Sequence, residues 1–133
     1  MMTSMETTKL LALAVALLCS ACQTIPTGQV LVEAGPKPTT DQAEAVIRAQ
    51  LARTLRDPDS MKAFKVVSGP DEMTATNAGG NFERAWLVCA EYNAKNAYGG
   101  YTGLSSHAFP MRQHAGEWVV VSAINWRSMS KQC

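Results

Sequence analysis

The sequence lacks clusters of like charge. Its 12 Lys and Arg and 11 Asp and Glu residues are scattered along 133 positions and leave a formal net charge of +1. A protein that holds nucleic acid through phosphate contacts has a concentrated basic surface, and so does one that binds anionic lipid headgroups through basic side chains. The even distribution of charge therefore argues against nucleic acid as a partner and against a polybasic membrane-surface role.

Residues that commonly carry chemistry are also few. There are two histidines, His107 and His114, without a well-placed Cys, Asp or Glu partner, and neither Cys89 nor Cys133 has a second ligand at the spacing of a metal site. Ser105, Ser106 and His107 are adjacent, but neighbours on a strand point to opposite faces, and the glycine frame of a nucleophile elbow is missing. We therefore predict no metal, no cofactor and no catalytic residue. A small hydrolase that uses Glu91 or His107 is the alternative.

No apolar run reaches the length of about 20 residues that a membrane-spanning helix needs. The run Leu10–Leu18 has nine apolar residues after a lysine, which is typical of the hydrophobic region of an export signal. Ser20, Ala21 and Cys22 then resemble the lipobox of bacterial lipoproteins, in which small residues precede a cysteine that is acylated and becomes the mature N-terminus. The resemblance implies a lipoprotein signal peptide over 1–21 and lipidation of Cys22. A plain cleaved signal is the alternative.

An acylated Cys22 implies a cell-envelope protein that a lipid anchors to a membrane. Gln23 follows the cysteine and is not acidic, so the retention signal of lipoprotein sorting is missing, which implies the outer membrane, facing the periplasm. Prolines and glycines interrupt residues 22–38, and this stretch is expected to be a flexible tether. An edge strand over Gln29–Val32 is the alternative for part of it.

Two cysteines remain for the folded part, because Cys19 leaves with the signal and Cys22 takes the lipid. An exported protein folds where disulfides persist, so we predict that Cys89 and Cys133 form a disulfide, which also fastens the C-terminus. A buried free Cys89 beside a loose C-terminal cysteine is the alternative.

Residues 39–133 are expected to form a single α+β domain. Apolar residues at helical spacing predict an amphipathic helix over Asp41–Arg56, which ends before the proline at 58. This N-terminal helix is expected to pack on a small antiparallel sheet of four to five strands. The expected strands cover residues 64–68, 73–76, 82–93, 104–111 and 117–123, with a stop at Gly69-Pro70, a turn over 113–116, and two apolar faces that mark 82–93 as central.

Two segments carry a family resemblance. The sequence Asp-Pro-Asp-Ser at 57–60 follows the expected helix, and VCAEYNAKN at 88–96 leads into YGGYTG at 98–103. They are similar to a DPDS-type turn and a VCGE-N-AKN-YGGY-G-type segment in a family of small, uncharacterised bacterial lipoproteins and periplasmic proteins. Ala90 stands where glycine is usual. The resemblance implies export and fold, and no particular activity.

The loop over 93–103 is the best candidate for function. Its glycines let a ligand approach the backbone closely, and its two tyrosines offer flat surfaces with a polar tip. We hypothesise a non-enzymatic module that binds a cell-wall glycan, a peptide or an envelope protein through this loop. The side chains expected to contact the ligand are Asn93, Lys95, Asn96, Tyr98 and Tyr101.

Other interpretations of the domain remain open at this point. A tight loop whose Asn and Gly residues satisfy turn geometry, and whose tyrosines cover the core, would have the same composition. An accessory subunit of an envelope complex, making its contact through apolar positions such as Trp126, is a further alternative to the binding module and to the hydrolase.

Overall fold

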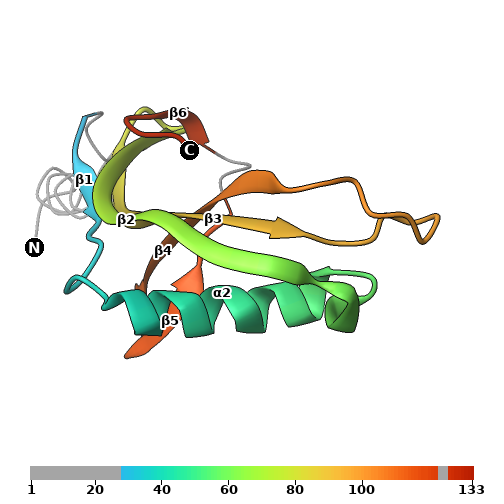
Figure 1. Ribbon diagram of the computed structural model, residues 1–133. Coiled ribbons are helices and arrows are strands. Elements are labelled where there is room, and N and C mark those ends of the chain that lie inside the picture. The colour runs from blue at the N-terminus through green and yellow to red at the C-terminus, as the bar shows by residue number, and fades with distance from the viewer. Residues whose placement is uncertain (1–27, 123–125) are drawn as a thin grey trace, which may run out of the picture.

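The computed structural model describes residues 28–122 and 126–133, with side chains described for 28–122 and 129–133. Within these ranges one α-helix lies against a curled β-sheet (Figure 1). The expected signal peptide, Cys22 and the side chain of Trp126 lie outside the described part. In chain order the elements are β1 (Val30–Val32), α2 (Thr40–Thr54), the 3₁₀ turn η1 (Pro58–Ser60), β2 (Lys62–Asn77), β3 (Phe82–Asn93), β4 (Ser105–His114), β5 (Glu117–Val120) and β6 (Trp126–Met129).

The α+β class is confirmed, with a correction to the order of the elements. Five strands lie in the order β5-β4-β3-β2-β6 with antiparallel neighbours, and β1 pairs in parallel with β3 outside this path. The expected N-terminal position of the helix is wrong, because β1 precedes α2 in the fold. The segment before the helix is extended and apolar, which lets it join the sheet.

Strand β1 uses a part of β3 that β4 leaves free. Val30 lies opposite Phe82 at the start of β3, whereas β4 pairs with β3 only from Trp86 onward. The indole N–H of Trp86 also donates to the carbonyl oxygen of Gly35 at 3.2 Å. The second half of the tether expected over 22–38 therefore belongs to the fold. Its glycines and prolines exclude a helix, but they leave the chain extended, and extended backbone suits strand pairing.

Helix α2 begins at a capping box. The hydroxyl of Thr39 accepts from the backbone N–H of Gln42 at 3.2 Å, and the amide oxygen of Gln42 accepts from the backbone N–H of Thr39 at 2.9 Å. The helix ends at Thr54, two residues before the expected end at Arg56, because Leu55 already has an extended backbone. The prediction of this element from its apolar spacing is otherwise confirmed.

Strand β3 is central and buries both of its faces, as its two apolar faces predict. Helix α2 covers one face and the C-terminal segment covers the other. The core on the helix side contains Ala43, Ile47 and Leu51 from α2, Val88, Ala90 and Tyr92 from β3, and Phe109 and Met111 from β4. The core on the opposite side contains Met73, Ala75, Ala85, Leu87 and Cys89, with Met129 of β6 packed against it.

Strand β2 is longer than the sequence predicts. The expected stop at Gly69-Pro70 is wrong, because β2 continues through both residues and merges the two short strands expected on either side. The pairing with β3 shifts register around Ser68, between Val66 and Asp71. Such bulges take up an extra residue and let a proline without an N–H sit inside a strand. The irregular stretch lies where β2 passes from the helix-side core to the opposite core.

The predicted hairpin between β4 and β5 is confirmed, with a shorter turn. His114 pairs with Glu117, so the turn consists of Ala115 and Gly116 alone rather than of residues 113–116. Both residues have positive φ, 51° and 82°. Two consecutive positive φ values define the tight turn whose twist matches the twist of paired strands.

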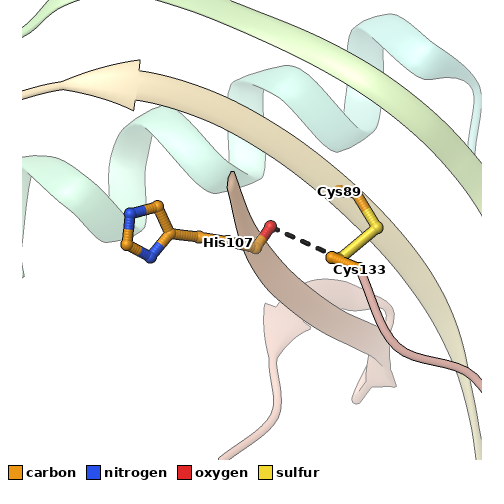
Figure 2. Close-up of a disulfide and its surroundings, with 3 residues drawn as sticks. All are labelled: Cys89, His107 and Cys133. Atoms are coloured by element: carbon orange, nitrogen blue, oxygen red, sulfur yellow. Dashed lines mark hydrogen bonds between the residues drawn. A yellow bond between two sulfur atoms is a disulfide. The ribbon is translucent and has the colours of Figure 1, made fainter. Parts of the chain in front are cut away.

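The predicted disulfide between Cys89 and Cys133 is present, with the two Cα atoms 5.6 Å apart. It joins the last residue to the central strand on the face opposite the helix. Figure 2 shows the sulfur of Cys133 beside β4, 3.6 Å from the carbonyl oxygen of His107, while the His107 ring points away. A disulfide sulfur carries no proton, so this is a packing contact. The C-terminus is thereby fixed over the second core.

Candidate functional site

The candidate loop rests on the turn that follows the helix. The hydroxyl of Tyr101 donates to the carbonyl oxygen of Ser60 at 2.9 Å. The hydroxyl of buried Ser60 donates to the carbonyl oxygen of Asp57 at 2.7 Å and accepts from the backbone N–H of Lys95 at 3.5 Å. The ammonium of Lys95 lies 3.8 Å from the carboxylate of Asp57. The two segments that carry the family resemblance therefore contact each other.

Two asparagines fix the outer part of the loop. The amide oxygen of Asn96 accepts from the backbone N–H of Tyr98 at 2.9 Å and from that of Gly100 at 3.1 Å. The amide oxygen of Asn93 accepts from the backbone N–H of Gly103 at 3.2 Å. Asparagine side chains of this kind reproduce the hydrogen bonds of a backbone turn. Because these oxygens accept hydrogen bonds from the loop backbone, the main role of Asn93 and Asn96 is to stabilise the conformation of the loop.

Lysine side chains lie over the Tyr101 ring. The Lys62 ammonium is 4.4 Å from the ring centroid and the Lys95 ammonium is 5.8 Å from it. A cation at this distance is attracted to the negative face of an aromatic ring. The ring is thus flanked by charge while its hydroxyl is held by the turn. Tyr101 contributes to the base of the loop more than to an open binding surface.

Tyr98 differs from the other four predicted binding residues. Its side chain is 97% exposed at the tip of the loop. Figure 1 shows the connection between β3 and β4 reaching away from the rest of the molecule. The backbone beneath Tyr98 is held by Asn96, so the ring is presented on an ordered turn. Leu104, 58% exposed, adds apolar surface at the end of the loop.

One polar pair was not predicted from the sequence. The hydroxyl of Ser105 lies 2.8 Å from Nε2 of His107, because residues two apart on a strand share a face. The comparison of Ser105 with its immediate neighbours overlooked this spacing. The His107 ring stacks on Tyr92 at 4.6 Å between centroids, and burial raises the pKa of the Tyr92 hydroxyl.

The pair does not extend to a catalytic set in the described part of the chain. Glu91 pairs with Ser106 in the ladder, whereas His107 pairs with Ala90, so Glu91 and His107 lie on opposite faces of the sheet. Among the described residues no group of three His, Cys, Asp or Glu residues is placed to hold a metal ion. The two residues named for the alternative hydrolase therefore do not converge.

A second surface lies between the helix and the edge strand β5. It is a groove of about 420 Å³ lined by apolar side chains together with an amide and a guanidinium. No sequence pattern marks it, because it exists only where α2 and β5 meet. Its lining residues are Ala45, Val46, Ala49, Gln50, Arg53, Trp118, Val119 and Val120.

Comparisons of the chain with protein-family models, with curated proteins and with solved structures gave no match. Among the described residues no helix has the length and apolar character needed to cross a membrane.

Proposed function

We propose that the protein is a lipid-anchored component of the bacterial cell envelope, attached through Cys22 to the outer membrane and facing the periplasm, where its Tyr98 loop binds a glycan or an extended peptide. The observation that carries the binding role is the contrast within the loop. Tyr98 is 97% exposed, while the side chains of Asn93, Asn96 and Tyr101 are engaged in holding the loop.

An ordered loop with one free aromatic ring is well suited to binding. Tyrosine has few rotatable bonds, so it supplies a large contact area at a low entropic cost, and its ring and hydroxyl serve apolar and polar groups together. Because the turn beneath Tyr98 is already hydrogen-bonded, little backbone freedom is lost when a ligand docks. Lys62 and Lys95 at the base of the loop add positive charge.

The two segments on which the family resemblance was based, residues 57–60 and the loop, contact each other. Ser60 accepts one hydrogen bond from Tyr101 through its carbonyl oxygen and another from Lys95 through its hydroxyl. A turn and a loop that hold each other in this way give a physical reason for the DPDS-type and AKN-YGGY-G-type segments to occur together. The proposal therefore treats them as one structural unit that supports the tip.

The binding role is tested by Tyr98→Ala in the full-length protein expressed in cells. We expect the variant to fold as the parent does, since Tyr98 buries almost no surface, and to lose most of the capture of wall material or envelope peptides in pull-down experiments. Val67→Ala, an exposed apolar position on β2 that belongs neither to the loop nor to the groove beside β5, is the matched control. Equal capture by Tyr98→Ala and the parent would remove the loop from the proposal.

The anchoring role is tested separately by metabolic labelling with a fatty-acid probe. The parent is expected to take the label, and Cys22→Ala is expected to lose it. Label that persists in Cys22→Ala would refute the assignment of this cysteine, whatever the result at Tyr98.

The groove beside β5 favours one further candidate, the docking of an apolar extended peptide along this strand. Within the described part of the chain, strand β5 is the last in the sheet order, and a sheet edge next to an apolar groove suits the addition of a strand. Ala49→Arg places a long cation at the groove and leaves the loop untouched. Loss of capture in this variant, with Tyr98→Ala unaffected, would favour the groove over the loop.

A further inference from the structure

Exposed apolar side chains gather at the end of the sheet that contains β1. Val30 is 40% exposed, Leu31 is 43% exposed, and Phe82 is 36% exposed. Val30 and Phe82 are neighbours in the β1–β3 ladder, so their side chains share one face, and Leu31 points to the other. We call these three residues the β1 patch. Its members flank the end of the sheet on both sides.

The described chain starts at this same end. The backbone N–H of Gly28 donates to the carbonyl oxygen of Gly80 at 3.1 Å, and the backbone N–H of Phe82 donates to the backbone carbonyl oxygen of Gln29 at 2.8 Å. Six peptide steps separate Cys22 from Gly28. At full extension they span about 20 Å, so a lipid on Cys22 keeps the β1 patch within that distance of the bilayer surface.

We propose that the β1 patch rests in the interfacial layer of the membrane to which the lipid is attached. The inference rests on the acylation of Cys22 given under the proposed function. The transfer of phenylalanine, leucine and valine side chains from water to the boundary between headgroups and acyl chains lowers the free energy. Arg84, two residues from Phe82 on β3, is paired with Glu33 at 3.3 Å and with Glu72 at 3.8 Å, so the contact is apolar rather than a headgroup phosphate site.

Membrane contact at β1 fixes the direction of the candidate loop. Strand β3 starts at Phe82 beside the patch and ends at Asn93, where the loop begins. Twelve residues in a strand span about 40 Å. Figure 1 shows β1 and the loop at opposite ends of the molecule. The contact therefore points Tyr98 away from the bilayer, toward the periplasm.

The test uses full-length protein in vesicles of phosphatidylethanolamine and phosphatidylglycerol. A benzophenone amino acid replaces Phe82 or Leu31, with the same replacement of Val119 as a control of similar exposure on β5 and of Tyr98 as a distant control. After illumination, mass spectrometry measures lipid adducts. We expect at least a five-fold excess of adducts at positions 82 and 31. Equal yields at all four positions, or protein adducts at 82 in place of lipid, would overturn the membrane contact.

The intact mass of the same samples separates this inference from the anchoring on which it rests. Protein without acyl chains would overturn both. Acylated protein with equal adduct yields would overturn the membrane contact alone. Circular dichroism of each variant checks that the probe has not unfolded it, and Phe82→Ser should lower the adduct yield at position 31 several-fold, whereas Val119→Ser should leave it unchanged.

Discussion

Removal of the disulfide is expected to cost a large part of the stability of the domain, and Cys133→Ala is the cleanest way to remove it. Cys133 is exposed, so the substitution deletes little buried surface. Cys89 remains in the second core at 4% exposure, where a free thiol packs like a small apolar side chain. The folded state therefore changes little, and the main effect is on the unfolded chain.

The magnitude follows from the length of the closed loop. The two cysteines are 44 residues apart in sequence. In the chain-entropy model, opening a loop of this length frees the unfolded chain by about 13 cal/mol/K, which is about 4 kcal/mol at 25 °C. A small domain has a total of about 5–15 kcal/mol. The variant should thus lose roughly a quarter or more of its free energy of unfolding.

The assay is urea unfolding in a Cys22→Ala background, which removes the site proposed for acylation. The midpoint should fall by roughly 1–4 M in Cys133→Ala, given the usual dependence of unfolding on urea. Treating the parent with a reductant should reproduce this shift, and the same reductant should not affect Cys133→Ala. A loss below about 1 kcal/mol would refute the entropic reasoning, because it would mean that the open chain is no freer than the closed one.

Three further predictions concern stability. Gly69→Ala should destabilise the fold by at least about 2 kcal/mol in urea unfolding, because φ is 85° and an added Cβ would overlap the carbonyl oxygen of Leu87; a neutral effect would mean that the β2 bulge adjusts freely. Ala115→Asn should stabilise by about 0.5–1 kcal/mol in the same assay, since asparagine tolerates the positive φ of 51° better than alanine, and a loss of stability would contradict this view of the turn. Burial raises the pKa of Tyr92 above 10.0, so the folded state holds the proton longer than the unfolded state. The contribution of Tyr92 to stability is then full below the pKa of the unfolded state and is lost as pH rises through the higher pKa of the folded state. Tyr92→Phe should therefore lose less stability than the parent between about pH 9 and about pH 11; identical pH profiles would contradict the reasoning.

The local elements of the fold were predictable because their signals are local. The apolar spacing between Ala43 and Leu51 specifies a helix, and the alternation through β3 specifies a strand with two buried faces. The disulfide followed from elimination, since only Cys89 and Cys133 remained to pair. Predictions were wrong where residues that usually end a strand are accommodated by a contact with a distant segment. Gly69-Pro70 ends most strands, but a bulge against β3 carries β2 through it.

In the candidate loop, too, the sequence predicted the segment, and long-range contacts decided the role of each residue. Its glycines, asparagines and tyrosines marked it in the sequence, but five residues of similar chemistry were grouped together. Contacts with Ser60, which is 41 residues from Tyr101 in sequence, decide that Tyr101 supports the loop and leave Tyr98 exposed at its tip. A contact of that range depends on where the helix ends and where β3 ends, which no local pattern contains.

The sequence by itself determined most element types and the single disulfide pairing, because each depends on short-range pattern or on counting, and the location in the cell envelope stays a prediction from the same kind of pattern. Tertiary structure alone decided that β1 joins the sheet, that the helix and the C-terminus cover opposite faces of β3, and which loop side chain stays exposed. The physical reason is that burial and hydrogen-bond partners are shared between distant segments, and their outcome is set only when the segments pack together.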